Sequence, residues 1–322
     1  MRQFINQLKS NESINEVYQV NEKFLRANTQ GKLYSQFLLC ARTGMIDARY
    51  WTGSEELFAT VDSGDYVKIN GFTQKYQGNF QMVVREFEKV DRSTINEDDF
   101  LHVAAATIDI PAMVARIREM FHSTLQSPDL LNLADCYLAD AEFMDRFCSS
   151  PAGIKLHHAY RGGLLEHTVS MMEMATRIAP IYGKTLNQEI LLLATFLHDT
   201  GKIEELTGTE VFTSTDAGQL LGHPLLGIRI LDKKISEVEK LTGEPIEEKN
   251  AMVLRHLIIS HHGELANGSP KLPMTLEAIV LHYLDSLDAK LAEFQKHMIE
   301  DPSCGSSWTN YIPAIERKLF KG

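Results

Sequence analysis

The chain has 322 residues, a length that fits two or three domains rather than one small module. Hydrophobic residues make up 44% and charged residues 23%, which excludes a largely disordered chain. The formal net charge of −11 argues against unspecific adsorption to nucleic acid, although a local basic groove is compatible with it. The four cysteines lie far apart without a CxxC pair, so we expect neither a thiolate zinc site nor a disulfide framework.

A cytoplasmic protein without a membrane partner fits these features best. No apolar run approaches the roughly 18 residues that span a bilayer, and the first residues lack the apolar stretch of a signal peptide. Charge also divides the chain, because residues 1–92 contain 12 Lys and Arg against 11 Asp and Glu, whereas residues 93–322 contain 20 against 32. This imbalance predicts two units with different tasks.

Residues 1–92 are predicted to form a small β-barrel. Apolar and polar residues alternate in 16–20, 33–39 and 66–72, and a further run at 80–84 follows a turn. About five short strands over roughly 80 residues are typical of a closed barrel. Their order and spacing resemble an OB-fold, a barrel that often binds single-stranded nucleic acid.

Aromatic and basic side chains in this barrel are candidates for nucleic-acid contacts. Stacking on bases is expected of aromatic rings, and phosphate contacts are expected of Lys and Arg. The candidates are Tyr34, Phe37, Phe72, Tyr76 and Phe80 for stacking, with Lys68, Lys75 and Arg85 for phosphate. The alternative for each aromatic residue is a place in the barrel core.

The rest of the chain has helical patterns. A polar break at 96–99 is followed from Pro111 by apolar residues at helical spacing, which predicts a connector helix region over residues 93–130. Residues 131–322 are predicted to form an all-α helical bundle. The predicted fold is therefore a multidomain α and β protein, with the barrel preceding the bundle.

Twelve histidines occur, and the local sequence around several of them suggests a site. His167 shares the inward face of a helix with Gly163. His198 and Asp199 end an apolar helix over 191–197 that must be buried, and a buried carboxylate needs a partner.

More polar residues in apolar surroundings follow along the chain. His223 comes after Gly222, and the pair His261–His262 ends another apolar stretch. Asp285 and Asp288 lie within a predicted helix from Leu276 to about residue 299, surrounded by apolar residues at helical spacing.

Read in order, these residues give the pattern H…HD…H…HH…D on several helices. Imidazole nitrogen and carboxylate oxygen are ligands for Mn, Fe, Mg, Co, Ni or Zn. Two ions about 3.5–4 Å apart are a common arrangement for phosphoester hydrolysis. The structural alternative is a set of core and helix-capping histidines without a metal.

His167, His198, Asp199 and Asp285 resemble the H…HD…D signature of the HD-domain metal-dependent phosphohydrolases, which are all-helical. The fuller resemblance is to the YhaM-type 3′→5′ exoribonucleases, which join an OB-fold to an HD domain. It is carried by residues 157–168, 197–202, 220–223 and 282–290 and extends over nearly the whole chain. Thr200 departs from the usual HDxGK motif, in which an aliphatic residue is more common, and we expect it to pack rather than ligate.

The resemblance implies a site for two divalent metal ions, with Mn expected first. His167, His198, Asp199 and Asp285 would surround one ion, and Asp199 would bridge to a second. The implied ligands of the second ion are His223 and one or both of His261 and His262. Lys202 would contact a phosphate oxygen, the alternative being a surface lysine. His157, His158 and Arg161 would contact substrate phosphate or support the ligands.

The implied activity is 3′→5′ hydrolysis of single-stranded RNA or DNA to nucleoside 5′-monophosphates, and the chain could form a homo-oligomer. One alternative is a phosphohydrolase for nucleotides or cyclic dinucleotides, although the segment after His262 lacks the Gly-Tyr-Pro of cyclic-dinucleotide enzymes. A second alternative is a nucleic-acid-binding protein without catalysis. Turnover of oligonucleotides against mononucleotides distinguishes the first alternative, and metal analysis distinguishes the second.

Overall fold

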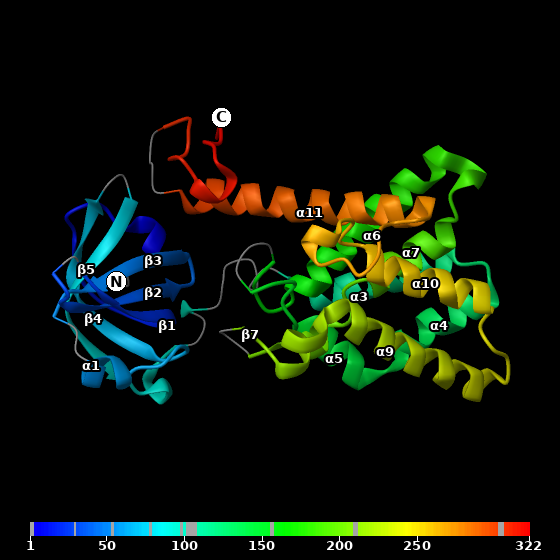
Figure 1. The fold of residues 1–322 in the computed structure, drawn as a ribbon, viewed down its shortest axis with the longest axis horizontal. Coiled ribbons are helices and arrows are strands. Elements are labelled where there is room, and N and C mark those ends of the chain that lie inside the picture. Colours follow the sequence, from blue (N-terminus) through cyan, green and yellow to red (C-terminus); the bar gives the residue numbers. More distant parts are fainter. Residues whose placement is uncertain are drawn as a thin grey trace. The chain divides into compact units, whose positions relative to one another are not determined.

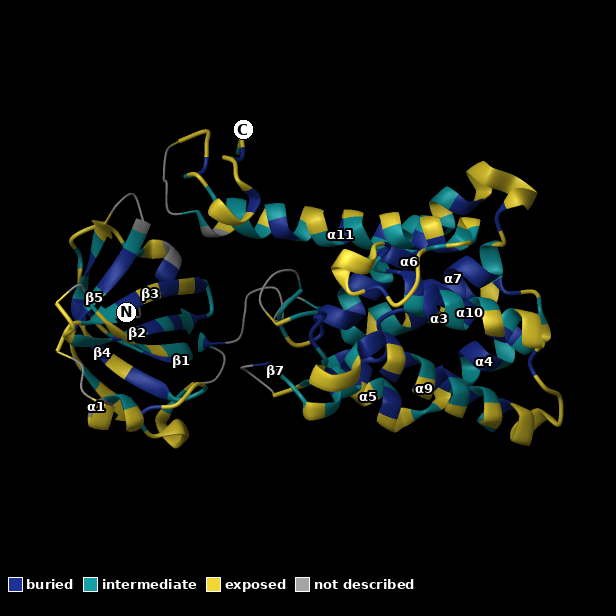
Figure 2. Ribbon diagram, viewed as in Figure 1, coloured by how far each residue is buried: buried dark blue, intermediate teal, exposed yellow. Residues whose placement is uncertain are grey.

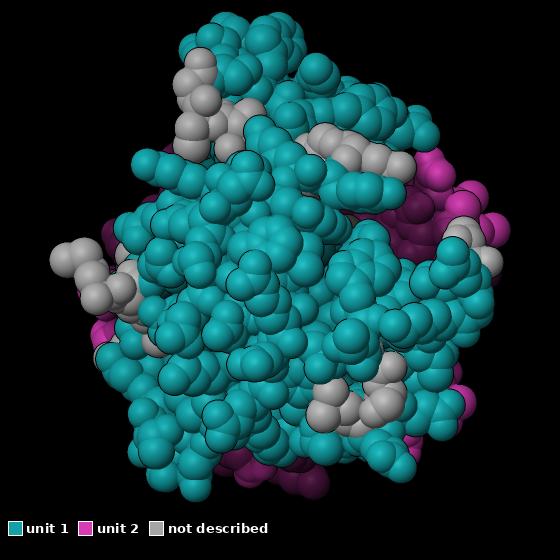
Figure 3. Space-filling view, turned by 90° about the vertical axis from the view of Figure 1, so that its left-hand side faces the viewer, with its two compact units in different colours: residues 1–107, 294–322 teal, residues 108–293 magenta. Residues whose placement is uncertain are grey.

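The computed structural model describes residues 3–28, 30–52, 55–76, 79–96, 99–100, 108–154, 158–208, 212–301 and 306–322. The chain divides into two compact units, residues 1–107 with 294–322 and residues 108–293, which Figure 3 distinguishes by colour. The sequence-based boundaries after residues 92 and 130 stay predictions.

The first unit contains a closed five-stranded barrel (Figure 1). Its strands are β1 (Ser13–Ala27), β2 (Leu33–Ala41), β3 (Gly44–Tyr50), β4 (Tyr66–Tyr76) and β5 (Asn79–Val90), and the short helix α1 (Glu55–Ala59) separates β3 from β4 in sequence. The strand order is β1-β2-β3-β5-β4, and antiparallel pairing of β1 with β4 closes the barrel. Only β3 and β5 pair in parallel among these strands. The predicted barrel of the OB-fold type is confirmed.

Buried and half-buried residues alternate along β2, and this alternation places Phe37 on the core side. Ser35, Phe37, Leu39 and Ala41 are buried and the residues between them are half-buried, as expected of a strand with one face on the core. Phe37 is only 2% exposed and packs in the barrel core, so its predicted role in substrate contact is wrong.

The second unit is a helical bundle (Figure 1). Its helices are α3 (Ile110–Thr124), α4 (Pro128–Ala139), α5 (Ala141–Ser149), α6 (Gly163–Tyr182), α7 (Gln188–Leu197), α8 (Lys202–Glu205), α9 (Asp216–Thr242), α10 (Glu248–Ser260) and α11 (Leu276–Glu300). The short strands β6 (Leu206–Thr207) and β7 (Thr213–Ser214) pair between α8 and α9. The predicted helical domain is confirmed, and residues 294–300 of α11 are grouped with the first unit.

Helix α7 forms the centre of the bundle, and its inner residues are coloured as buried in Figure 2. The Asn187 side chain caps its first turn by accepting hydrogen bonds from the N–H groups of Glu189 and Ile190. Every residue from Ile190 to Leu197 is buried, as the apolar sequence predicts. The Phe196 ring contacts four other aromatic rings, those of Phe121, Tyr137, Phe143 and Phe147. This packing fixes the end of α7, where the HD pair begins.

Helix α3 lies in the range predicted as a connector. It buries Ile117, Met120 and Phe121 in the core of the helical unit. In the part of the chain that the structure describes, no helix is long and apolar enough to cross a membrane.

Candidate metal centre and nucleic-acid interface

All seven predicted metal ligands converge in the helical unit, although they come from five places in the sequence. His167 lies in the first turns of α6, and His198 and Asp199 follow the last residue of α7. His223 lies in α9, directly after a kink at which Gly222 adopts a φ of 73°. The remaining ligands are His261 and His262, just after α10, and Asp285 in α11.

The first group consists of His167, His198, Asp199 and Asp285. The Nε2 atom of His167 lies 3.3 Å from Nε2 of His198 and 3.4 Å from Oδ1 of Asp285. The Oδ2 atom of Asp199 lies 3.3 Å from Nε2 of His198 and 3.7 Å from Nε2 of His167. Ligand atoms of His167, His198 and Asp199 therefore lie within 4.8 Å of one another, and Asp285 adjoins this group through His167.

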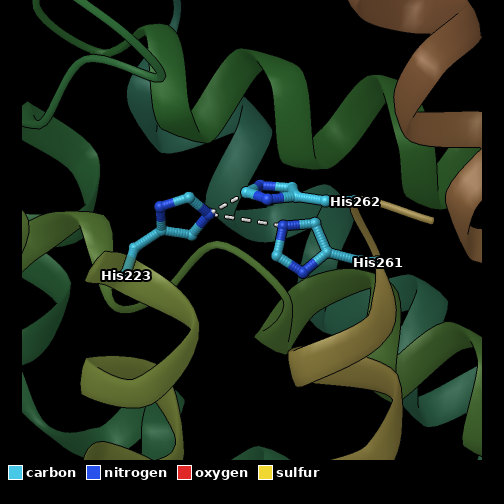
Figure 4. Close-up of side chains that lie close together, drawn as sticks. All are labelled: His223, His261 and His262. Atoms are coloured by element: carbon cyan, nitrogen blue, oxygen red, sulfur yellow. Dashed lines mark hydrogen bonds between the residues drawn. The ribbon is translucent and has the colours of Figure 1, made fainter. Parts of the chain in front are cut away.

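The second group consists of His223, His261 and His262 (Figure 4). The Nε2 atom of His223 lies 3.3 Å from Nε2 of His261 and 3.1 Å from Nε2 of His262. The other oxygen of Asp199, Oδ1, lies 3.3 Å from Nε2 of His223 and 3.7 Å from Nε2 of His261. Asp199 therefore presents one oxygen to each histidine group.

Backbone carbonyls fix the orientation of two of these imidazoles. Nδ1 of His198 lies 2.7 Å from the carbonyl oxygen of Thr195, and Nδ1 of His261 lies 2.6 Å from that of Ile258. A carbonyl oxygen only accepts hydrogen bonds, so both Nδ1 atoms carry the proton and donate it. The Nε2 lone pairs then point into the centre.

Carboxylates fix the orientation of two further imidazoles. Nδ1 of His167 donates to Oδ2 of Asp288 at 2.7 Å, and Nδ1 of His223 donates to Oε2 of Glu205 at 2.9 Å. Such carboxylate–histidine pairs are common around metal ions, because they fix the tautomer and strengthen the imidazole as a ligand.

The centre therefore gathers lone pairs that need a positive charge. Oδ1 of Asp199 is buried and has no hydrogen-bond partner among the described residues. Burial lowers the pKa of His167, but Asp285 and Asp288 outweigh that effect and raise it to about 9, which shows how strongly this position favours a cation. Burial and the neighbouring His262 hold the pKa of His261 well below its usual range, so this ring stays neutral and able to ligate. The donor set fits a divalent metal ion.

The outward side of the barrel carries aromatic rings beside arginines. Tyr34 is half-buried and its ring centroid lies 4.9 Å from that of Trp51, which is 40% exposed. The Arg49 guanidinium lies over both the Trp51 ring and the Tyr76 ring, at 5.7 and 5.9 Å from their centroids. This surface therefore joins strands β2, β3 and β4.

The same pairing recurs elsewhere on the barrel. Half-buried Phe72 lies under the Arg85 guanidinium at 5.2 Å, and Phe24 lies under Arg26 at 5.1 Å. Lys68 and Lys75 are exposed on β4. Sequence analysis missed four of these residues, namely Phe24, Arg26, Arg49 and Trp51. We call the set Phe24, Arg26, Tyr34, Arg49, Trp51, Phe72, Tyr76 and Arg85 the arginine–aromatic surface.

Comparison with known proteins agrees with both parts of the chain. The HD domain family matches residues 164–290, the range that contains the seven predicted ligands. The 3′-5′ exoribonuclease YhaM of Bacillus subtilis (strain 168) is 32% identical over 295 residues, covering 91% of this chain and 89% of that protein. YhaM of Geobacillus sp. (strain WCH70) is 33% identical over 293 residues, covering 91% and 86%. The chain belongs to the YhaM family.

A solved structure also matches part of this YhaM-family chain. The second OB-fold domain of replication protein A from Methanococcus maripaludis matches 30% of this chain and 100% of that one, with 20% identity and a TM-score of 0.24. The OB-fold type of the barrel here rests on its own strand order and closure.

Lys202 lies inside the metal centre of this YhaM-family chain. Its Nζ atom is 2.6 Å from Oδ2 of Asp199, and the residue is only 9% exposed, so the alternative of a surface lysine is wrong. Burial would raise the pKa of Asp199, but Lys202 and His198 hold it well below its usual range. Thr200 is buried and donates to the carbonyl oxygen of Leu197, in agreement with the expected packing role.

Of the residues predicted just before α6, His158 supports the centre. Its Nε2 atom lies 3.1 Å from Oδ2 of Asp288, the carboxylate that holds His167, and its Nδ1 atom lies 3.0 Å from Glu166. Burial lowers the pKa of His158, but hydrogen bonds to Asp288 and Glu166 raise it on balance. Contact of His158 with substrate stays a prediction.

The other two predicted residues of this segment are Arg161 and His157. Arg161 is exposed and makes no ion pair with a described residue. His157 lies outside the described residues. Their contact with substrate stays a prediction.

Sequence analysis did not single out Glu205, which contacts the candidate ligand His223 in the helical unit. Glu205 is the last residue of α8, the short helix that begins at Lys202. Its carboxylate accepts hydrogen bonds from Nδ1 of His223 and, at 3.2 Å, from the backbone N–H of the same residue. Burial raises the pKa of Glu205, but His223 lowers it further, so the carboxylate is ionised. The sequence marks Glu205 only as an acidic residue soon after the HDTGK motif, which does not distinguish it from Glu204.

Replacing Glu205 with glutamine is expected to weaken metal binding roughly 10- to 100-fold, because His223 loses a charged acceptor that orients it. A competition titration with a fluorescent Mn²⁺ or Zn²⁺ indicator measures this affinity. Glu204→Gln is the matched control, since Glu204 pairs with Arg229 instead of His223. Equal affinities for both variants would contradict the orienting role of Glu205.

Proposed function

We propose that this chain is a metal-dependent 3′-5′ exoribonuclease that hydrolyses single-stranded RNA or DNA to nucleoside 5′-monophosphates at a binuclear centre. The observation that carries the proposal is the position of Asp199, whose two oxygens each face a separate group of histidines. One shared carboxylate between two histidine groups is the arrangement of a two-metal hydrolytic site.

The proposed ligands follow from this geometry. His167, His198 and Asp285 would hold one ion with Oδ2 of Asp199, and His223, His261 and His262 would hold the other with Oδ1. Manganese is the ion we expect, although the donor set also suits Fe, Mg, Co, Ni or Zn. Bound divalent ions lower the pKa of water and stabilise negative charge on a phosphoryl group.

The chain's own residues position these groups before substrate arrives. Asp288 and Glu205 hold two imidazoles with their Nε2 atoms inward. The Lys202 ammonium pairs with Asp199 at 2.6 Å, beside the proposed metal ligands. It would contact a non-bridging phosphate oxygen and thereby orient the terminal phosphodiester.

The arginine–aromatic surface would hold the strand upstream of the cleaved bond. Bases stack on aromatic rings without strong sequence preference, and arginine adds attraction to both bases and phosphates. This surface replaces buried Phe37 in the predicted set and keeps Tyr34 and Phe72. Lys68 and Lys75 are exposed on β4 and would contact the phosphate backbone.

Location and assembly are part of the proposal. No disulfide forms among the three cysteines that the structure describes, which supports a reducing cytoplasm. A homo-oligomer stays a prediction.

The experiment is digestion of a single-stranded RNA labelled at its 5′ end, in the presence of Mn²⁺. We expect a ladder that shortens from the 3′ end and nucleoside 5′-monophosphates as products. A circular RNA of the same sequence has no 3′ end and should stay intact. Cleavage of the circle, or turnover of mononucleotides or cyclic dinucleotides in place of the RNA, would contradict the proposal.

A further inference from the structure

The last residues of the chain form a small hairpin, residues 306–322. Trp308 is bridged to Phe320, and Ile312 to Arg317, in antiparallel fashion. The N–H of Thr309 donates to the carbonyl oxygen of Leu319 at 2.9 Å, within the same hairpin. Residues before the hairpin hold its open end, because Asp301 accepts the N–H of Asn310 and pairs with Lys321 at 2.9 Å.

The two sides of this C-terminal hairpin differ in exposure. Thr309, Ile315 and Leu319 are buried, so one side is covered. Trp308 and Phe320 are 51% and 57% exposed, and their ring centroids lie 5.1 Å apart with the rings tilted. Exposed aromatic rings that lie together are common at interaction sites.

Charge on the hairpin is opposite to that of the protein. Residues 306–322 contain the basic residues Arg317, Lys318 and Lys321 against one acidic residue, Glu316, in a chain whose net charge is −11. Arg317 and Lys318 are exposed, and Lys318 lies two residues before Phe320, with buried Leu319 between them. A cation therefore lies near the aromatic pair, and this combination attracts a polyanion that can also stack.

We propose that the C-terminal hairpin is a second contact site for single-stranded nucleic acid, with bases stacking on Trp308 and Phe320 and phosphates contacting Lys318. This inference rests on the proposed function, because the substrate of that function is such a strand. A second copy of the chain is the rival occupant. However, a stable protein interface uses about 20–30 residues a side, more than the 17-residue hairpin spanning 306–322 can supply.

The chain offers a direct test, because it contains only two tryptophans, Trp51 on the barrel and Trp308 on the hairpin. Trp51→Phe leaves Trp308 as the single fluorescent reporter, and Trp308→Phe leaves Trp51. Each variant is titrated with an oligouridylate of about 15 nucleotides in EDTA, so that binding is measured without hydrolysis. We expect the oligonucleotide to quench Trp308 emission in the first variant.

Affinity provides the second readout. Trp308→Ala is expected to weaken oligouridylate binding about tenfold, and Lys318→Ala is expected to reduce the slope of log affinity against log salt by about 0.7. Tyr182→Ala is the matched control, because Tyr182 is 56% exposed at the end of α6 and lies outside the hairpin. Its affinity should equal that of the wild type.

The outcomes separate this proposal from the proposed function. Unchanged Trp308 emission at saturating oligonucleotide, together with an unchanged salt slope for Lys318→Ala, overturns the hairpin site even if the enzyme cuts RNA normally. Quenching of Trp308 in a protein that never cuts RNA supports the hairpin site and refutes the nuclease. If the variants change the sedimentation coefficient and not the affinity, the hairpin joins copies of the chain and the proposal is wrong.

Discussion

Replacing Asp199 with asparagine is expected to reduce hydrolysis of single-stranded RNA at least about a thousandfold. Both oxygens of Asp199 face imidazole nitrogens at 3.3 Å, and asparagine would direct an NH₂ group at one of the two histidine groups. It would also remove the negative charge that pairs with Lys202. Release of nucleoside 5′-monophosphates in Mn²⁺ measures the rate, and elemental analysis measures the bound metal.

Asp216→Asn is the control for this variant. Asp216 is exposed in the first turn of α9, the helix that carries His223, and lies outside both histidine groups. We expect wild-type activity and metal content for the control and loss of both for Asp199→Asn. Full activity of Asp199→Asn, in a protein with a normal thermal transition, would refute the shared-carboxylate centre.

Replacing Gly201 with alanine is expected to cost about a hundredfold in activity and about 1–3 kcal/mol in the free energy of unfolding. The backbone of Gly201 is in the ordinary right-handed region, so conformational strain is not the cause. A Cβ atom there would lie 2.0 Å from the carbonyl oxygen of His223 and 2.6 Å from the backbone nitrogen of Gly227. The helices α8 and α9 would have to separate, which moves His223 away from Asp199.

Gly227→Ala tests the same contact from the other side. A Cβ atom on Gly227 meets its closest neighbour, Cγ2 of Ile258, at 3.4 Å, an ordinary van der Waals distance. Alanine also favours a helix more than glycine does. Thermal melts and RNA turnover should therefore be near wild type for Gly227→Ala, and equal behaviour of the two variants would contradict the close approach at Gly201.

Sequence alternation predicted most of the barrel but not its inner and outer faces. A period of two shows which residues of a strand share a face, and nothing in it tells which face meets the core. Alternation alone therefore leaves Phe37 a candidate for substrate contact, although the ring is buried. Arg49 lies in β3 and Trp51 follows the last residue of that strand, and only the folded barrel brings Arg49 to Tyr76 of β4.

The candidate ligands could be predicted because each is a polar residue next to apolar sequence that is expected to be buried. A buried polar group needs a partner, and a metal ion can be that partner. Which partner holds which ligand could not be predicted, because the hydrogen bond from His167 to Asp288 joins residues 121 positions apart. Helix α11 shows the same limit: Tyr283 and Leu287 belong to its apolar pattern, yet they are 67% and 46% exposed. Apolar residues surround Asp285 in the sequence, but Asp285 and Asp288 point to the other side of the helix, toward His167.

The proposed ligands begin at His167 and end at Asp285, so the centre is complete only when most of the chain is present. A product that stops before Asp285, whether released early from the ribosome or clipped by a protease, retains the barrel sequence and lacks one carboxylate ligand. Such a fragment keeps the residues of the arginine–aromatic surface and lacks a complete set of the proposed metal ligands. We therefore expect it to be inactive on RNA although its barrel sequence is intact.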